Sequence, residues 1–147
     1  MKLFDRVTRE LERFLHQPHV GTWLICGGRD FSNRAMFDNT MRDLVRRKGW
    51  PQKIVHGGAS GADSMAASWA EQMDIEAVEV PADWATHGKA AGPIRNQQML
   101  DLHDPQLVVA FPGGKGTLDM ATRARKAGVA VIEISIVKME QRETAND

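Results

Sequence analysis

The sequence has a single cysteine, no net charge and no long apolar run, and each of these features argues against a class of protein. Its single cysteine, Cys26, leaves no partner for an internal disulfide and fits a reducing compartment, so we expect a cytoplasmic protein with a buried, inert thiol. Nineteen basic and nineteen acidic residues cancel, which argues against a nucleic-acid partner. No apolar stretch approaches the length of a membrane span, so we expect no membrane partner.

Several familiar catalytic and cofactor motifs are also missing. The five histidines show no spacing typical of metal ligands, so we expect no metal and no cofactor. The chain has no G-x-S-x-G elbow of a serine hydrolase. It contains neither G-x-x-x-x-G-K-[ST] nor G-x-G-x-x-G after a strand, which argues against an ordinary P-loop NTPase or NAD-dependent dehydrogenase.

What the chain does contain is three glycine-rich turns, each placed between an apolar run and a helical pattern. Glycine lets the backbone approach a ligand closely, and the free N–H groups at a helix start favour an anion. One such turn is most simply a tight turn, but three in the same context predict a ligand-binding edge of a parallel sheet. The turns are Gly27-Gly28-Arg29-Asp30, Gly57-Gly58-Ala59-Ser60-Gly61-Ala62-Asp63 and Phe111-Pro112-Gly113-Gly114-Lys115-Gly116-Thr117.

Strand and helix patterns alternate along most of the chain, which predicts a parallel sheet covered on both faces. We therefore expect an α/β fold, a Rossmann-like three-layer sandwich with about five strands. Its domain would cover 21–137, after an accessory segment 1–20 with an amphipathic helix at 2–16 and before a polar tail at 138–147. The expected strands are 22–26, 53–56, 75–80, 106–111 and 129–136, and the expected helices are 33–48, 61–74, about 93–102 and 117–127.

The segment 81–96 is long for a connection between a strand and a helix, and long connections in compact domains are often functional. Gly92-Pro93 predicts a helix start, which places Arg95 in the first turn. A cation there opposes the helix dipole, so an anionic ligand explains it well. A pair with Asp83 or Asp101, or a solvated side chain, is the alternative.

Other candidate residues have a functional and a local interpretation. Trp84 could stack on a base or plug the domain edge. Lys89 and Lys115 could contact phosphate or be solvated surface charges. Asp63 and Asp119 fall just inside helix starts, where a carboxylate is favourable for local reasons alone.

Four motifs follow one another in order: Gly27-Gly28-Arg29-Asp30-Phe31; His56-Gly57-Gly58-Ala59-Ser60-Gly61-Ala62-Asp63; Asp83-Trp84 with Gly88-Lys89-Ala90-Ala91-Gly92-Pro93-Ile94-Arg95-Asn96; and Phe111-Pro112-Gly113-Gly114-Lys115-Gly116-Thr117. This series, within about Thr22 to Ile134, resembles the YspA/cpYpsA-related SLOG family. That superfamily joins the DNA-processing SMF/DprA proteins to the LOG phosphoribohydrolases on a Rossmann-like fold. The resemblance implies a nucleotide or nucleotide-derived ligand bound across the glycine loops.

The LOG enzymes release a base from a nucleoside 5′-monophosphate, using an Arg in a helix and a Glu in P-G-G-x-G-T-x-x-E. Arg95 stands at the Arg position of that resemblance, but Met120 stands at the Glu position. Asp119 lies one residue early, and one residue along a helix rotates a side chain by about 100°. Asp119 therefore need not replace the Glu.

Three functions follow, in this order of preference: binding of a nucleotide-derived ligand, ADP-ribose-like, as a sensor or carrier; N-glycosidic hydrolysis of a nucleoside monophosphate; and single-stranded DNA binding. The hydrolase would use Arg95 and Asp119 as catalytic residues. The helix at 2–16 could cover a sheet edge or form a homodimer. The expected ligand-binding residues are Gly27, Gly28, Arg29, Gly57, Gly58, Ser60, Gly61, Asp63, Trp84, Lys89, Arg95, Asn96, Gly113, Gly114, Gly116 and Thr117.

Overall fold

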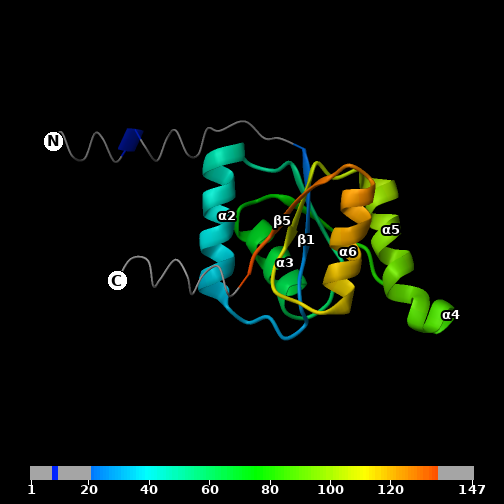
Figure 1. Ribbon diagram of the computed structural model, residues 1–147. Helices are drawn as coiled ribbons and strands as arrows, with labels where there is room; N and C mark the ends of the chain where they lie inside the picture. The colour runs from blue at the N-terminus through cyan, green and yellow to red at the C-terminus, as the bar shows by residue number, and fades with distance from the viewer. Residues whose placement is uncertain (1–7, 10–20, 136–147) are drawn as a thin grey trace.

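The computed structural model describes residues 8–9 and 21–135, and these contain a five-stranded sheet (Figure 1). All four strand pairs are parallel, which confirms the expected α/β Rossmann-like arrangement. The strands are β1 (Thr22–Cys26), β2 (Lys53–His56), β3 (Glu76–Glu79), β4 (Leu107–Ala110) and β5 (Ala130–Glu133). The helices are α2 (Arg34–Lys48), α3 (Ala62–Gln72), α4 (Trp84–His87), the 3₁₀ turn η1 (Gly88–Ala90), α5 (Ala91–His103) and α6 (Lys115–Lys126).

The expected helix at 2–16, apart from residues 8–9, and the expected tail at 138–147 lie outside the described residues. The domain boundaries predicted from the sequence therefore stay predictions. None of the helices in the described ranges is both long enough and apolar enough to cross a membrane.

The strand order β3-β2-β1-β4-β5 places β1 at the centre of the sheet. The chain moves outward from β1 through β2 to β3, then returns to the other side of β1 and moves outward again through β4 to β5. The connections leave β1 and β4 in opposite directions, which makes the carboxyl ends of these two strands a topological switch point. In open α/β sheets such a point is where ligands bind.

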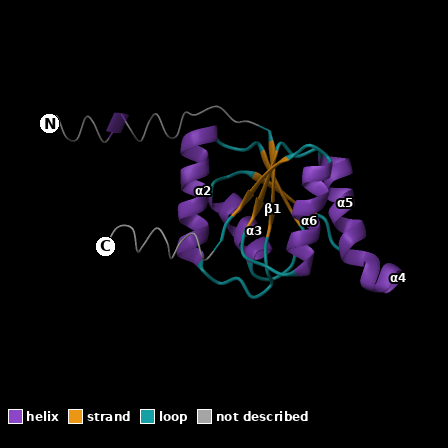
Figure 2. Ribbon diagram, in the orientation of Figure 1, coloured by secondary structure: helices purple, strands orange, loops and turns teal. Residues whose placement is uncertain are grey.

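The sheet is covered on both faces, as Figure 2 shows with α2 on one side of the strands and α5 and α6 on the other. One core cluster joins α2 and α3 to strand residues such as Ile25, Ile54 and Val109. The other joins α5 and α6 to Leu24, Val55 and other strand residues of the opposite face. Successive residues of a strand point to opposite faces, so the adjacent Leu24 and Ile25 belong to different clusters.

The central strands are apolar throughout because both of their faces are covered. All four residues of β4 are buried, and four of the five residues of β1 are buried. The edge strands β3 and β5 have no fully buried residue and carry glutamates at their ends. Continuous apolar runs in the middle and charge at the edges are typical of a parallel sheet that avoids edge pairing.

The segment after β3 is more helical than the sequence predicts. Residues 81–92 were expected to form a loop, but α4 and η1 occupy 84–90 and lead directly into α5. The expected helix start at Pro93 is wrong, because α5 begins at Ala91. Pro93 is then the third residue of the helix, where a missing N–H still costs no intrahelical hydrogen bond. Arg95 consequently lies just past the first turn.

Candidate functional site

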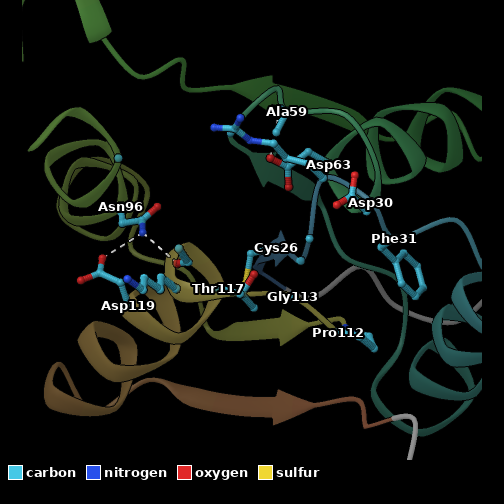
Figure 3. A pocket seen from close by; sticks show the side chains of 18 of the residues that line it. Cys26, Asp30, Phe31, Ala59, Asp63, Asn96, Pro112, Gly113, Thr117 and Asp119 are labelled. Atoms are coloured by element: carbon cyan, nitrogen blue, oxygen red, sulfur yellow. Dashed lines mark hydrogen bonds between the residues drawn. The ribbon is translucent and has the colours of Figure 1, made fainter. Parts of the chain in front are cut away.

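A cavity of about 1050 Å³ lies at the carboxyl ends of β1, β2 and β4, at the switch point of the sheet. Its size matches the upper range of cavities that bind small ligands. Figure 3 shows Cys26 in its middle, with Asp63 on one side and Gly113 and Thr117 on the other. The three glycine turns predicted from the sequence therefore meet around one cavity.

The turns after β1 and β4 contact each other through their backbones. The N–H of Gly28 donates to the carbonyl oxygen of Pro112 at 2.9 Å. A Cβ atom at Gly113 would lie 2.7 Å from the nitrogen of Gly28 and would also collide with the hydroxyl of Thr117. The contact therefore needs glycine at position 113. The glycines of this motif allow the backbones of the two turns to approach closely.

The N-terminus of α6 opens toward this cavity without a side-chain cap. Its N-cap is Gly114, and no side chain of the described residues accepts from the first-turn N–H groups. Around Gly114 and Gly116 there is open space, since a Cβ atom at either position would meet nothing within 4 Å. Lys115 lines the same part of the cavity. Uncapped N–H groups beside a lysine can hold an anion.

The turn after β2 is placed differently, because most of it packs on other loops. The hydroxyl of Ser60 donates to the carbonyl oxygen of Arg29 at 3.2 Å. Gly61 has a φ of +76°, and a Cβ atom there would collide with the carbonyl of Gly28. Gly58 lies against the side chain of Glu79. These three predicted ligand residues, Gly58, Ser60 and Gly61, lie outside the cavity lining.

Asp63, in the first turn of α3, is the buried acid of the cavity. Its side chain lines the cavity, the residue is only 6% exposed, and its Oδ2 accepts from the N–H of Ala59 at 3.2 Å. Burial raises the pKa of this carboxyl, and the N–H of Ala59 and the nearby charges of His56 and Arg95 oppose the rise without cancelling it. The cavity therefore contains a carboxyl group whose charged form is disfavoured by burial.

Arg95 lines the cavity but already uses several of its donors within the protein. Its Nη1 donates to the carbonyl oxygens of Gly57 at 3.0 Å and Val80 at 3.4 Å. Its Nε donates to Oδ1 of Asn96 at 3.1 Å. Arg95 thus ties α5 to the ends of β2 and β3, and a ligand could use only the donors that remain.

Asn96 and Asp119 join α5 to α6 at the other end of the cavity (Figure 3). The buried amide of Asn96 donates to the carbonyl oxygen of Gly116 at 3.2 Å and to Oδ2 of Asp119 at 2.9 Å. Arg123 also donates to Asp119, at 2.8 Å. Burial acts to raise the pKa of Asp119, but the hydrogen bonds from Arg123 and Asn96 outweigh it, and the pKa is lowered. A carboxylate of lowered pKa is a weak general base.

The floor of the cavity carries no catalytic acid at the position that the family resemblance singles out. Met120 is fully buried in the core between the sheet and α6, and it is not part of the cavity lining. Cys26 does line the floor, but burial and the charge of Asp63 raise the pKa of its thiol to about 12. The thiolate that would act as a nucleophile is therefore scarce at neutral pH.

Trp84 and Lys89 lie at the rim of the cavity on α4 and η1. Trp84 is half exposed, and a Cβ atom at Gly92 would lie 3.6 Å from its ring. An exposed aromatic at the mouth of a cavity offers a flat apolar surface to a ligand. Lys89 adds an exposed positive charge beside it.

Thirteen of the sixteen expected ligand residues line the cavity, all except the three of the β2 turn described above. Sequence reasoning did not select several other lining residues, among them Phe31, which packs on the ring of Phe111 at a centroid distance of 5.3 Å. Several of them, such as Phe31 and Pro112, could have been selected because they lie in or next to the glycine turns. The lining also includes Lys115 and Asp119, which were named as candidates from the sequence. The further lining residues are Ile25, Cys26, Asp30, Phe31, Ser32, Asn33, Met36, Ala59, Gly92, Pro93, Met99 and Pro112.

The described part of the chain shows no metal cluster, and it has a second cavity beside the first. No group of three or more His, Cys, Asp or Glu side chains there is placed to hold a metal ion. A smaller cavity of about 480 Å³ lies between α5 and α6, lined by Arg123, Lys126 and four other residues, and it shares Asp119 with the first.

Fold and cavity together define a Rossmann-like α/β protein with a cavity at the switch point of its sheet, where open α/β sheets bind ligands. Residues 23–87 match the model of the YspA, cpYpsA-related SLOG family. The chain is also 38% identical over 116 residues to the Gene 61 protein of Mycobacterium phage D29, across 74% of this chain and 92% of that protein. The chain belongs to the YspA/cpYpsA-related SLOG family.

Proposed function

We propose that the protein binds a nucleotide or nucleotide-derived ligand, ADP-ribose-like, in the cavity at the switch point, and that it acts as a sensor or carrier of that ligand. The observation that carries this proposal is the uncapped start of α6, which opens into the cavity beside Lys115. Membership of the SLOG family supports a nucleotide-related ligand. In this proposal the phosphate lies on the N–H groups of 115–117, where the helix dipole favours negative charge.

The base of the ligand would lie toward the rim. Trp84 is exposed there, and stacking on a base would cover part of its ring. Lys89 on the neighbouring turn would attract a second phosphate or another anionic group. A cavity of this volume has room for more than a mononucleotide, which favours an extended ligand of the ADP-ribose kind.

The test is calorimetric titration of the purified protein with AMP and ADP-ribose. Lys115→Gln removes the charge beside the proposed phosphate, and it should weaken binding by about tenfold. Lys126→Gln, at the opposite end of the same helix, is the matched control and should bind as the wild type does. Absence of binding by the wild type to both compounds, or equal affinities of the two variants, would contradict the proposal.

Hydrolysis of a nucleoside monophosphate is the second candidate, because Arg95 and Asp119 both line the cavity. The contacts of Asp119 disfavour it: the carboxylate is engaged by Arg123 and Asn96, and its lowered pKa weakens it as a base. Chromatography of AMP incubated with the protein decides the matter. Release of adenine that Asp119→Asn abolishes would establish the hydrolase.

A further inference from the structure

The cavity contains one group that does not suit an anion, the carboxylate of Asp63. Two other acids line the cavity, but Asp30 is exposed and Asp119 is paired with Arg123. Asp63 is 6% exposed and forms no ion pair within the described part of the chain. A buried carboxylate without a paired cation is costly, so its presence in a ligand cavity needs a reason.

The protein satisfies Asp63 only in part. Its donors are the backbone N–H groups of Ala59, at 3.2 Å, and Gly57. The guanidinium of Arg95 is near, but its Nη1 is directed to backbone carbonyls and its Nε to Asn96. A carboxylate has about four acceptor positions. About two acceptor positions therefore have no donor among the described residues, and the residue lines the cavity.

The free acceptor positions of the Asp63 carboxylate determine which ligand group can contact it. A phosphate would be repelled, while a hydroxyl would donate a hydrogen bond. The neighbouring residues of the same turn, Gly57 and Ala59, are too small to hold a base between flat surfaces. The aromatic side chains of the lining, Trp84 and Phe31, come from other segments. A sugar with adjacent hydroxyls fits this position better than a base.

We propose that Asp63 accepts hydrogen bonds from the ribose hydroxyls of the ligand, so that the cavity selects ribonucleotides over deoxynucleotides and over free phosphate. This inference rests on the proposed function, in which the phosphate lies at α6. Figure 3 shows Asp63 across Cys26 from Gly113 and Thr117, so a phosphate and a sugar of one ligand would contact opposite sides of the cavity.

The test compares AMP, 2′,3′-dideoxy-AMP and inorganic phosphate by calorimetry on the wild type, Asp63→Asn and Asp74→Asn. The wild type should bind AMP at least about tenfold more tightly than the dideoxy compound, since each hydrogen bond to a charged group is worth a factor of this order. Asp63→Asn should bind AMP about tenfold more weakly, yet bind the dideoxy compound and phosphate as well as the wild type or better, because a repelling charge is gone. Asp74→Asn removes the charge of an exposed residue beyond the other end of α3, and it should bind all three ligands as the wild type does.

Three results would overturn the inference, and they are distinguishable. Equal affinity of the wild type for AMP and the dideoxy compound removes the role of the hydroxyls while the proposed function stands. Equal weakening of all three ligands in Asp63→Asn shows that the residue supports the loop rather than the sugar. No binding of any ligand by the wild type rejects the proposed function together with this inference. If circular dichroism shows that Asp63→Asn is unfolded, the wild-type comparison of the two nucleotides decides alone.

Discussion

The loop that follows β2 and the loop that follows β4 both carry glycines, and both lead into a helix with a glycine at its N-cap. Their surroundings differ. In the first loop, Gly61 packs against the backbone of Gly28 and the following helix places the carboxylate of Asp63 in the cavity. In the second, Gly114 faces open space and the following helix begins with Lys115.

This difference separates two uses of glycine that look the same in a sequence. In the loop after β2, glycine permits a left-handed turn that packs on another loop. In the loop after β4, glycine leaves the helix start uncapped and accessible. Charge follows the same division, with a buried acid beside one loop and a lysine beside the other. We infer that only the second is suited to hold a phosphate.

The largest expected effect is a difference in the free energy of unfolding between two variants, each with alanine in place of one glycine of one loop. Gly61→Ala should lower the free energy of unfolding by about 3 kcal/mol or more, since φ is +76° and the new methyl meets the carbonyls of Gly28 and Arg29. Gly114→Ala should change it by no more than about 1 kcal/mol, because nothing lies near the added carbon. Urea denaturation followed by circular dichroism measures both. Equal losses would show that the two loops are packed alike.

A smaller effect is expected where α5 holds the start of α6. Asn96→Ala removes donors to Gly116 and Asp119 from a buried position, which should cost about 1–3 kcal/mol of unfolding free energy. It should also weaken AMP binding, because the first turn of α6 loses its anchor. Gln98→Ala, two residues along on the exposed side of α5, is the matched control. Asn96→Ala with unchanged stability and affinity would show that α6 is positioned by its packing alone.

The smallest effect distinguishes the two carboxylates by the pH dependence of stability. The pKa of Asp63 is raised in the folded protein, so stability from its protonated form is present at acid pH and lost as pH rises through the folded pKa. The pKa of Asp119 is lowered, so its contribution is present above the unfolded pKa and lost as pH falls through the folded pKa.

Asp63→Asn should therefore gain stability relative to the wild type as pH rises from 3 to 7, while Asp119→Asn should lose it, each by about 1 kcal/mol or less. Thermal unfolding across this pH range measures both trends. The reference is each variant at pH 3, the end of this range at which both acids are least ionised. Trends of the same sign in the two variants would contradict the opposite environments described for the two acids.

Much of the fold follows from the sequence, because apolar runs and helical periods are local signals. The runs at 22–26 and 53–56 are strands with the predicted bounds, and the glycine turns follow their strands as expected. The strand order does not follow from these signals, since it depends on contacts between distant segments. The short helix α4 was missed because Trp84–His87 is only four residues long and buries none of them.

The position of the site could be predicted from the sequence, but the directions of its side chains could not. The sequence placed three glycine turns at one edge, and the structure brings them to one cavity. It could not show that the hydroxyl of Ser60 donates to the carbonyl of Arg29, or that Arg95 donates to a backbone carbonyl. Both contacts depend on how separate loops pack. Nor could it distinguish the acid at the start of α3 from the acid in α6, whose environments give opposite pKa shifts.

The central claim is that phosphate lies at α6 and sugar at Asp63, and a crystal structure of the protein with AMP tests it most directly. The account predicts the phosphate within hydrogen-bond distance of the amide nitrogens of residues 115–117, and the ribose hydroxyls within hydrogen-bond distance of the Asp63 carboxylate. A phosphate bound instead at the start of α3, or AMP bound outside the cavity at the switch point, would contradict it.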